Sequence, residues 1–403
     1  MKRRSSPPRD TRNKVPRLEG LVEPVPKFLS NNANNFSQNF PFFREPREVG
    51  CFCLDESRQY HNDNHLLKFY RPPSNTKNLH LDLRLGYDTF IKQDDAGKIS
   101  SPIDDLLRWI RDHPNKFLPP TITDAASPDA RNRGKIFTDF ICWRGLLTKL
   151  LCTPFEEREG WIVSVVKFHD TYYMCEYETQ ERIDERNNTS QRQEEMSYWG
   201  YKFEQYVVAS KPHGQPENAS TPVNSNPGYN VVVRSRLESH SLVFAGEVDC
   251  CDPDNPKTMV ELKTSRLLTH PRQESSFMRF KLKKWWAQSF LVGIPKIICG
   301  FRDDDGIVRE LKTYRTMEIP NMVRDKPNMW NAGICFNFLN AFLSFVKKVM
   351  VMDNSTRSPY VFRYKPKVSR DKVVWECHPP DSMYSFLPDW YVQDDAELAD
   401  CSK

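Results

Sequence analysis

The chain has no long uninterrupted hydrophobic run. No apolar stretch reaches the roughly 18 residues that a membrane-spanning helix needs, and none near the N-terminus resembles a signal-peptide core. We therefore expect a water-soluble protein that stays inside the cell and enters no membrane. In a reducing compartment its eleven cysteines should be free thiols, and their odd number agrees with that expectation.

Glycine is also scarce, with 15 residues in 403. The sequence contains no Gly-rich phosphate loop and no Gly-x-Ser-x-Gly elbow, which excludes P-loop nucleotide hydrolysis and the common serine-hydrolase arrangement. The chain also has little excess of charge of either sign, because Lys plus Arg (58) exceed Asp plus Glu (53) by only five. So small a surplus does not by itself indicate nucleic-acid binding.

The composition changes at both ends of the chain. Residues 1–38 are rich in Pro, Arg, Asn and Ser, and we predict a disordered basic tail there. Its basic residues favour a nuclear address, and the alternative is a tail that binds polyanions nonspecifically. No linker interrupts residues 39–392, which we predict to be one folded domain, and 393–403 form an acidic, flexible C-terminus.

Hydrophobic periodicity predicts alternating strands and helices. Residues 103–110 have helical spacing, with Ser101 as the expected N-cap and Pro102 at the first helical position. Further helices are expected over 192–209, 276–291 and 330–352, and strands over 161–168, 171–177, 229–237, 241–249, 258–264, 295–301 and 307–315. This mixture, with several hairpins, indicates an α/β or α+β sheet fold.

The chemistry is concentrated in two short motifs, Gly246-Glu247-Val248-Asp249 and Glu261-Leu262-Lys263. Residues i and i+2 of a strand share a face, so three carboxylates and one ammonium converge if the two strands pair across the turn at 252–257. Carboxylates this close repel each other unless a cation neutralises them, and hard oxygen ligands select Mg²⁺ or Mn²⁺. Two such ions can position a water and stabilise the leaving oxygen of a phosphodiester.

In such a centre Lys263 would orient the water or help to deprotonate it, and would offset charge on the phosphorus. The alternative is an ordinary Glu-x-Lys pair on a solvated strand. Apolar neighbours favour a buried setting: Val243, Phe244, Ala245, Val248 and Val260.

Two other clusters have simpler alternatives. The segment 279–288 interleaves cations with Trp285 and Trp286, which suits a phosphate backbone and unstacked bases, but also an amphipathic helix with its tryptophans in the core. Four potential zinc ligands, Cys51, Cys53, His61 and His65, match no common finger spacing, and we predict a strand followed by a polar loop.

Taken together, the ordered motifs resemble the DXO family of decapping exoribonucleases. They are Trp143-Arg144-Gly145, Gly200-Tyr201-Lys202-Phe203-Glu204, Gly246-Glu247-Val248-Asp249, Glu261-Leu262-Lys263 and Lys284-Trp285-Trp286-Ala287-Gln288. The resemblance extends over about residues 38–392. It implies a two-sheet mixed β core flanked by helices, related to the PD-(D/E)xK nucleases. It also implies removal of NAD-type caps, incompletely methylated guanosine caps or 5′-triphosphate ends from RNA, with 5′ to 3′ exoribonuclease activity.

The same resemblance assigns site residues by position. Glu204, Glu247, Asp249 and Glu261 would hold two divalent ions, Mg²⁺ or Mn²⁺, together with the backbone carbonyl of Leu262. Lys263 and Gln288 would contact the scissile phosphate or the water. The remaining positions aligned with substrate contacts are Arg58, Trp143, Arg144, Gly145 and Asn230.

Two rival functions remain at this point. One is a noncatalytic protein that binds RNA 5′ ends or acts as the partner of an exonuclease. The other is a DNA nuclease that uses the same Glu-x-Lys motif. Retention of every ligand position favours the enzyme. The resemblance further implies a monomer acting on RNA 5′ ends, located in the nucleus with the cytoplasm as a second compartment, and it leaves a protein-partner exonuclease open.

Overall fold

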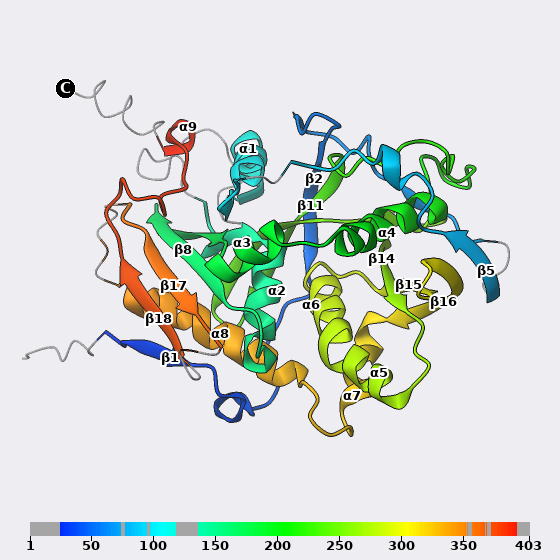
Figure 1. Cartoon of the computed structure of the whole chain (residues 1–403). Helices are drawn as coiled ribbons and strands as arrows, with labels where there is room; N and C mark the ends of the chain where they lie inside the picture. Colours follow the sequence, from blue (N-terminus) through cyan, green and yellow to red (C-terminus); the bar gives the residue numbers. More distant parts are fainter. Residues whose placement is uncertain are drawn as a thin grey trace, which may run out of the picture.

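Two β-sheets form the centre of the computed structural model, which describes residues 25–73, 77–94, 97–117, 136–351, 353, 357–366, 368 and 372–392 (Figure 1). The eleven-stranded sheet has the order β1-β18-β17-β8-β9-β7-β12-β11-β2-β3, with β6 paired to β9. Its strands are β1 (Phe28–Ser30), β2 (Arg47–Leu54), β3 (Tyr60–His61), β6 (Ser100–Ser101), β7 (Phe140–Trp143), β8 (Trp161–Phe168), β9 (Thr171–Tyr177), β11 (Gly228–Leu237), β12 (His240–Glu247), β17 (Tyr360–Tyr364) and β18 (Lys372–Cys377).

The second sheet has seven strands in the order β10-β4-β13-β14-β15-β16-β5. They are β4 (Phe69–Tyr70), β5 (Lys77–Asp82), β10 (Val208–Ala209), β13 (Cys250–Cys251), β14 (Met259–Arg266), β15 (Lys296–Arg302) and β16 (Ile307–Arg315). Mixed parallel and antiparallel pairing in both sheets confirms the predicted fold class.

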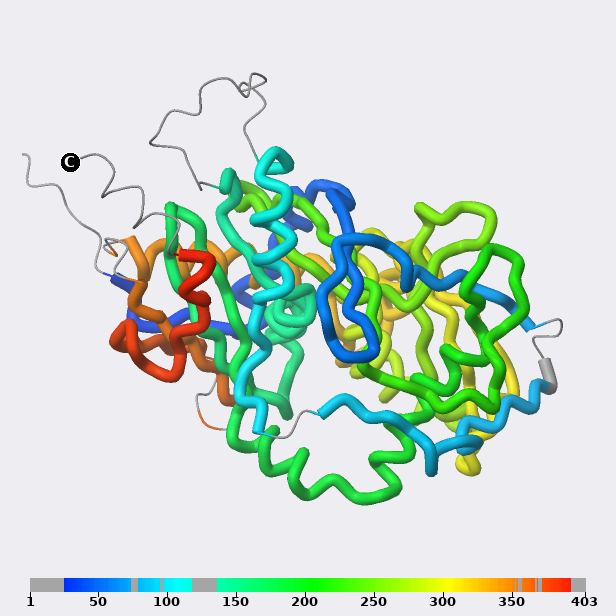
Figure 2. Tube along the Cα trace, turned by 90° about the horizontal axis from the view of Figure 1, so that it is seen from above, coloured from blue at the N-terminus to red at the C-terminus, as the bar shows by residue number. Residues whose placement is uncertain are grey.

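The α-helices are α1 (Asp104–Asp112), α2 (Arg144–Cys152), α3 (Gln180–Asn187), α4 (Gln191–Val207), α5 (Pro271–Ser276), α6 (Lys283–Leu291), α7 (Ile319–Val323), α8 (Ala332–Val349) and α9 (Asp389–Val392). A π-helical turn, Phe277–Leu282, joins α5 to α6. The α3–α4 segment runs from the side of the large sheet to that of the second sheet (Figures 1 and 2), and α4 packs on β14.

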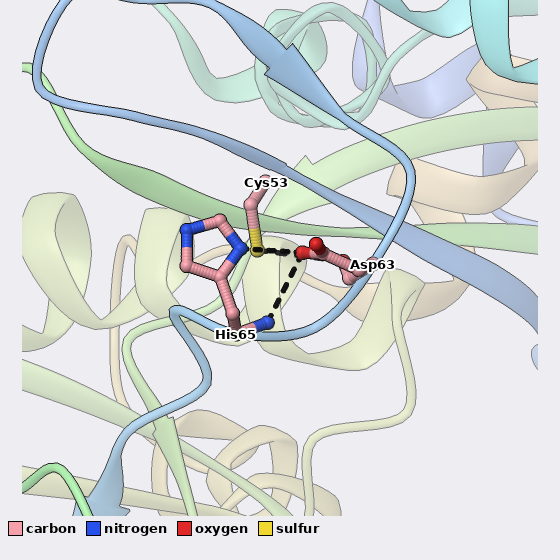
Figure 3. A group of neighbouring side chains, drawn as sticks. All are labelled: Cys53, Asp63 and His65. Atoms are coloured by element: carbon pink, nitrogen blue, oxygen red, sulfur yellow. Dashed lines mark hydrogen bonds and ion pairs between the residues drawn. The ribbon is translucent and has the colours of Figure 1, made fainter.

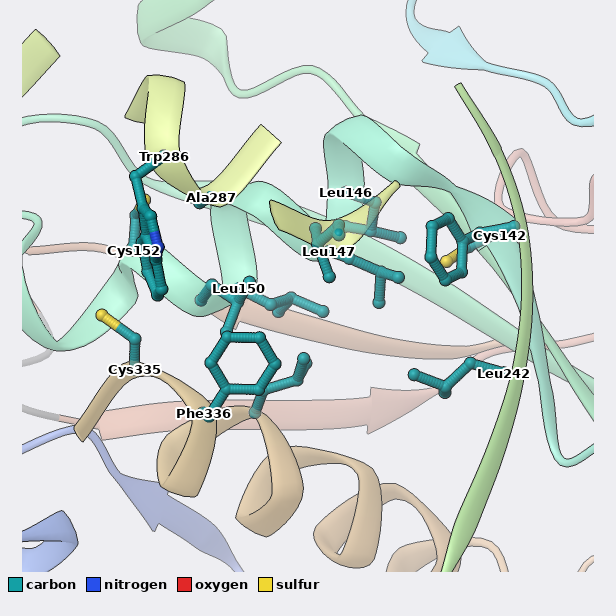
Figure 4. Close-up of a cluster of buried hydrophobic side chains, with 14 of the residues drawn as sticks. Cys142, Leu146, Leu147, Leu150, Cys152, Leu242, Trp286, Ala287, Cys335 and Phe336 are labelled. Carbon is teal, nitrogen blue, oxygen red and sulfur yellow. The ribbon is translucent and has the colours of Figure 1, made fainter. Parts of the chain in front are cut away.

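The main hydrophobic cluster joins both sheets to α2, α6 and α8. Figure 4 shows Leu150 of α2 on the side of Trp286 and Phe336, with Leu146 and Leu147 toward Cys142 and Leu242. By length and composition alone, helix α8 is apolar enough to cross a membrane. This was not predicted from the sequence. Because nine of its residues are buried in this cluster, it is a core helix of the fold.

The N-terminal boundary lies earlier than predicted. Residues assigned to the tail form β1, which pairs with β18, and a 3₁₀ turn at Ala33–Phe36. Phe36 packs edge-on against Phe338, with ring centroids 5.3 Å apart, and the Asn337 amide donates to the backbone carbonyl of Phe36. Residues 1–24, with the basic run, and 393–403 lie outside the described residues.

Two helix boundaries also differ from the prediction. Helix α1 begins at Asp104 with Ile103 at its N-cap, so the assignment of Ser101 as N-cap was wrong. Ser101 instead pairs with Glu176 in the β6–β9 ladder. Helix α4 ends at Val207, because Val208 and Ala209 turn into β10 and pair with β4.

Candidate active site

The two acidic motifs lie where the chain crosses from one sheet to the other. Glu247 is the last residue of β12 in the large sheet, and Glu261 and Lys263 are on β14 in the second. The predicted direct pairing of these strands was wrong in detail, since only Cys250–Cys251 pairs with Met259 and Val260. Val248 and Asp249 span the crossing, which places four carboxylates at the junction when Glu204 of α4 is included. These four are the acidic set: Glu204, Glu247, Asp249 and Glu261.

The carboxylates of the acidic set are close enough to affect one another's pKa values. Burial, followed by the charges of Asp249 and Glu247, raises the pKa of Glu204 well above its ordinary value. Burial and the charge of Glu261 raise the pKa of Asp249 to about 7. The backbone N–H of Leu262 donates to Asp249 Oδ2 at 2.6 Å and fixes that side chain against β14.

Glu261 is the buried member of the set, with 1% of its surface exposed. Its Oε1 lies 2.5 Å from Lys263 Nζ and its Oε2 3.6 Å from Arg144 Nη1. Burial alone would raise the pKa of Glu261, but the charges of Lys263 and Arg144 hold it below its ordinary value. Conversely, burial would lower the pKa of Lys263, but the charges of Glu261 and Asp249 raise it above its ordinary value.

One orphaned atom at this junction fits a bound cation, and the other fits an anion such as phosphate. Among the described residues, Glu261 Oε2 is buried and accepts no hydrogen bond, and Arg144 Nη1 donates none. A buried carboxylate oxygen without a hydrogen-bond donor costs free energy unless a ligand satisfies it. Hard oxygen donors of this kind suit a divalent metal ion.

Arg144 reaches the acidic set because residue 246 is a glycine. A Cβ at Gly246 would lie 2.9 Å from Arg144 Cβ and Cδ. Only a residue without a side chain lets the arginine lie across β12 at that point. Arg144 is the first residue of α2, directly after β7, whose Trp143 pairs with Ala245 beside that glycine.

The other predicted substrate contacts surround this centre. Asn230 of β11 lies opposite Glu247 in the ladder. Arg58, in the β2–β3 turn with φ +62°, donates to the Asn226 carbonyl at 2.9 Å, and its charge acts on Glu247.

Gly145 and Gln288 line one cavity of about 270 Å³ with Lys284. Trp143 and Gly145 line a second of about 250 Å³. Among the residues that the structure describes, no hydrogen bond or ion pair joins Trp143, Gly145 or Gln288 to the acidic set; the Trp143 indole donates instead to the Pro102 carbonyl.

The tryptophans of α6 are core residues rather than stacking platforms. Trp286 is 1% exposed and stacks on Trp330 at 4.8 Å, and Trp285 is 7% exposed. Lys283 is buried and donates to the Phe155 carbonyl, whereas Lys284 pairs with Glu159 at the cavity. The amphipathic-helix alternative therefore describes this segment.

The cysteine–histidine cluster is a strand and a polar loop, as predicted. Cys53, Asp63 and His65 do converge, with ligand atoms within 4.8 Å of one another (Figure 3). However, Cys53 Sγ donates to the Asp63 backbone carbonyl at 3.4 Å, and His65 Nδ1 binds the Asp63 carboxylate at 2.5 Å. Burial raises the pKa of the Cys53 thiol to about 11, and these hydrogen bonds already occupy the polar atoms of the cluster.

A mixed-sheet fold with a Glu-x-Lys strand beside further carboxylates fits the PD-(D/E)XK class of nucleases. Residues 44–392 match the model of one family in that class, described as "RAI1 like PD-(D/E)XK nuclease", and the chain belongs to this family. It is therefore a hydrolase of the nuclease class, and the resemblance inferred from the ordered motifs is confirmed.

Individual relatives agree with this assignment. The human decapping and exoribonuclease protein is 41% identical over 391 residues, which cover 95% of this chain and 92% of the relative. Schizosaccharomyces pombe Rai1, solved in complex with 3′-FADP, is 28% identical with a TM-score of 0.66, and the match covers 87% of this chain and 99% of that one. Candida albicans Rai1, solved with pU5 and Mn²⁺, is 23% identical with a TM-score of 0.75 over 92% and 99% of the two chains, which shows a shared fold.

Proposed function

We propose that this protein is a metal-dependent hydrolase of RNA 5′ ends that removes NAD-type or incompletely methylated guanosine caps, or 5′-triphosphates, and degrades RNA 5′ to 3′. The observation that carries the proposal is the convergence of four carboxylates with Lys263 and Arg144 at the junction of the sheets. The human relative, at 41% identity, is named a decapping and exoribonuclease protein. The S. pombe relative binds 3′-FADP, which supports a dinucleotide cap as substrate.

The acidic set and the Leu262 carbonyl would hold two divalent ions, Mg²⁺ or Mn²⁺. When bound, such ions activate water and neutralise charge on a phosphoryl group. The structure supports this with the orphaned Glu261 oxygen and with Glu204 and Asp249, whose pKa values are raised by burial and, secondarily, by the neighbouring carboxylates.

The chain's own cations have separate roles in this proposal. Lys263 is held by Glu261 and offers its remaining N–H groups to the scissile phosphate or the attacking water. Arg144 has an unsatisfied Nη1 and grips the 5′-terminal phosphates through its planar fork. Arg58 contacts a neighbouring phosphate, and Gln288 orients the water or phosphate from α6. Trp143, Gly145 and Asn230 shape the space around the terminal nucleotide.

The proposal also covers the compartment, the oligomeric state and the extent of the catalytic domain. The basic run between Lys2 and Arg17 supports nuclear residence, with the cytoplasm as a second compartment. We further propose that the protein acts as a monomer and that its catalytic domain extends from β1 to residue 392.

The direct test is hydrolysis of 5′-end-labelled RNAs bearing NAD, unmethylated guanosine, triphosphate and monophosphate ends, each with Mg²⁺, Mn²⁺ or a chelator. We expect metal-dependent release of an intact cap or of pyrophosphate, followed by mononucleotides. If the protein binds these ends but yields no product under any condition, the enzymatic proposal is wrong. Equal cleavage of single-stranded DNA would instead favour a general nuclease.

A further inference from the structure

A small aromatic recess lined in part by α4 has no role in the chemistry described above. Its volume is about 140 Å³, and its lining includes Tyr87, Phe90, Lys92, Gln93, Tyr201 and Ser225. We use the name aromatic recess for this cavity.

The recess presents aromatic surface to solvent. Tyr201 is 40% exposed, and its ring centroid lies 5.8 Å from that of Phe90 with 35° between the planes. Behind them, buried Tyr198 packs against Phe90 at 5.1 Å and against Tyr87 at 5.5 Å, so the recess has a rigid floor. An exposed ring on such a support loses little conformational entropy when another flat ring stacks on it.

Two elements connect the recess to the acidic set. On α4, Tyr201 precedes Glu204 by three residues, which is about 4.5 Å along the helix axis and on the same side of the helix. On the segment leading to β11, Ser225 is followed by Asn226, whose carbonyl accepts from Arg58, and by Gly228. A Cβ at Gly228 would lie 3.2 Å from Glu247 Oε1. The recess is therefore within reach of the nucleotides that flank a phosphate held at the acidic set.

The rim of the recess offers polar groups for the edge of a ring. Lys92 pairs with Glu194 at 3.1 Å, and the Ser225 hydroxyl accepts from the Gln93 backbone at 2.8 Å. Ser197 lines both the recess and a neighbouring polar cavity of about 700 Å³. That cavity contains Arg182, which also lines the cavity of Gln288 and Gly145. Through these shared lining residues the three cavities are neighbours, and cations beside exposed aromatic rings are features of sites that bind single-stranded nucleic acid.

We propose that the aromatic recess binds one unstacked nucleobase of the substrate, with Tyr201 as the stacking residue. The base belongs either to the transcript downstream of the cleaved bond or to the cap, and the chemistry of recognition is the same in both cases. Stacking accepts any base, so the recess would hold the strand without sequence preference. This inference rests on the proposed function, because the base is part of an RNA substrate.

The test compares Tyr201→Ala and Tyr201→Phe with the wild-type protein. The substrates are a 5′-monophosphorylated pentanucleotide, the same RNA with one abasic position at a time, and the same RNA with a NAD cap. A matched control is Phe28→Ala, which removes an aromatic side chain that is 46% exposed on the edge strand of the other sheet. Thermal unfolding of each variant shows whether the fold is retained.

We expect Tyr201→Ala to raise KM about tenfold, within the range for loss of one base–aromatic stack, with kcat little changed. Tyr201→Phe and Phe28→Ala should resemble wild type. If the transcript base is bound, the loss disappears with the RNA whose abasic position faces Tyr201. If the cap base is bound, the loss appears only with the NAD-capped RNA.

Two results would overturn the inference. One is an unchanged KM for Tyr201→Ala with every substrate. The other is an equal loss on all substrates, abasic ones included, which would make Tyr201 a structural residue. These results differ from failure of the proposed function, in which the wild-type protein itself cleaves none of the RNAs.

Discussion

The packing of Arg144 across Gly246 allows a sharp test of how the active site is built. In Gly246→Ala, the new methyl group would lie 2.9 Å from Arg144 Cβ and Cδ and 3.0 Å from Nε. The Cβ of Arg144 is fixed by the start of α2, so the conflict cannot be relieved by rotation of the side-chain end alone. Overpacking of this kind costs roughly 1–3 kcal/mol of stability.

The expected effect on activity is larger than the effect on stability. Displacement of the guanidinium breaks its alignment with Glu261, 3.6 Å away, and with the phosphate that it is proposed to bind. Loss of one preorganised donor at a reacting group costs on the order of 10²- to 10³-fold in kcat. We therefore expect Gly246→Ala to lower kcat/KM on 5′-monophosphorylated RNA by about 10²-fold, with little additional loss when it is combined with Arg144→Ala.

A matched control is available on α4. A Cβ at Gly200 would meet no atom within 4 Å, so Gly200→Ala should leave activity unchanged and raise stability by roughly 0.5–1 kcal/mol. Steady-state kinetics and urea unfolding of both variants provide the comparison. Wild-type activity and stability in Gly246→Ala would refute the idea that this glycine positions Arg144.

Two further predictions concern the supporting structure. The Trp330 indole N–H donates to the Met278 carbonyl in the π-helical turn at 3.0 Å, so Trp330→Phe should lower the free energy of unfolding by about 1–3 kcal/mol, measured with urea. Burial, together with the charge of Lys347, lowers the pKa of His240 to about 4. Because the unfolded chain then binds a proton that the folded one does not, stability present at pH 7 should fall by up to about 3 kcal/mol as the pH drops from about 6.5 toward 4. Unfolding of His240→Asn at several pH values should lack that part of the pH dependence, and an identical profile would show that His240 is not responsible.

Much of the fold could be predicted from the sequence, because long periodic segments form the elements that their pattern indicates. The strands at 229–237 and 161–168 and the helix over 330–352 lie within a few residues of β11, β8 and α8. What periodicity could not show is which sheet each strand joins. Glu247 and Glu261 are fourteen residues apart, and their separation into two sheets depends on the crossing at Val248 and Asp249, which has no local signal.

The candidate site was predicted unevenly for the same reason. The i, i+2 spacing of Glu261 and Lys263 has a direct structural consequence on a strand, and their ion pair is present. Glu204 carries no such signal, since a glutamate on a polar helix looks like a surface residue until the helix packs on β14. The role of Gly246 was also missed, although a glycine within a largely apolar strand is a sign of close approach.

The account depends most directly on the acidic set being the catalytic centre. Glu247→Gln combined with Asp249→Asn removes two charges but keeps the size of both side chains and the acceptor for the Leu262 N–H. We predict that this variant folds as wild type, still binds RNA 5′ ends, and loses at least about 10³-fold of its metal-dependent hydrolysis of them. Hydrolysis at the wild-type rate by a folded double variant would contradict the account and place the chemistry elsewhere in the protein.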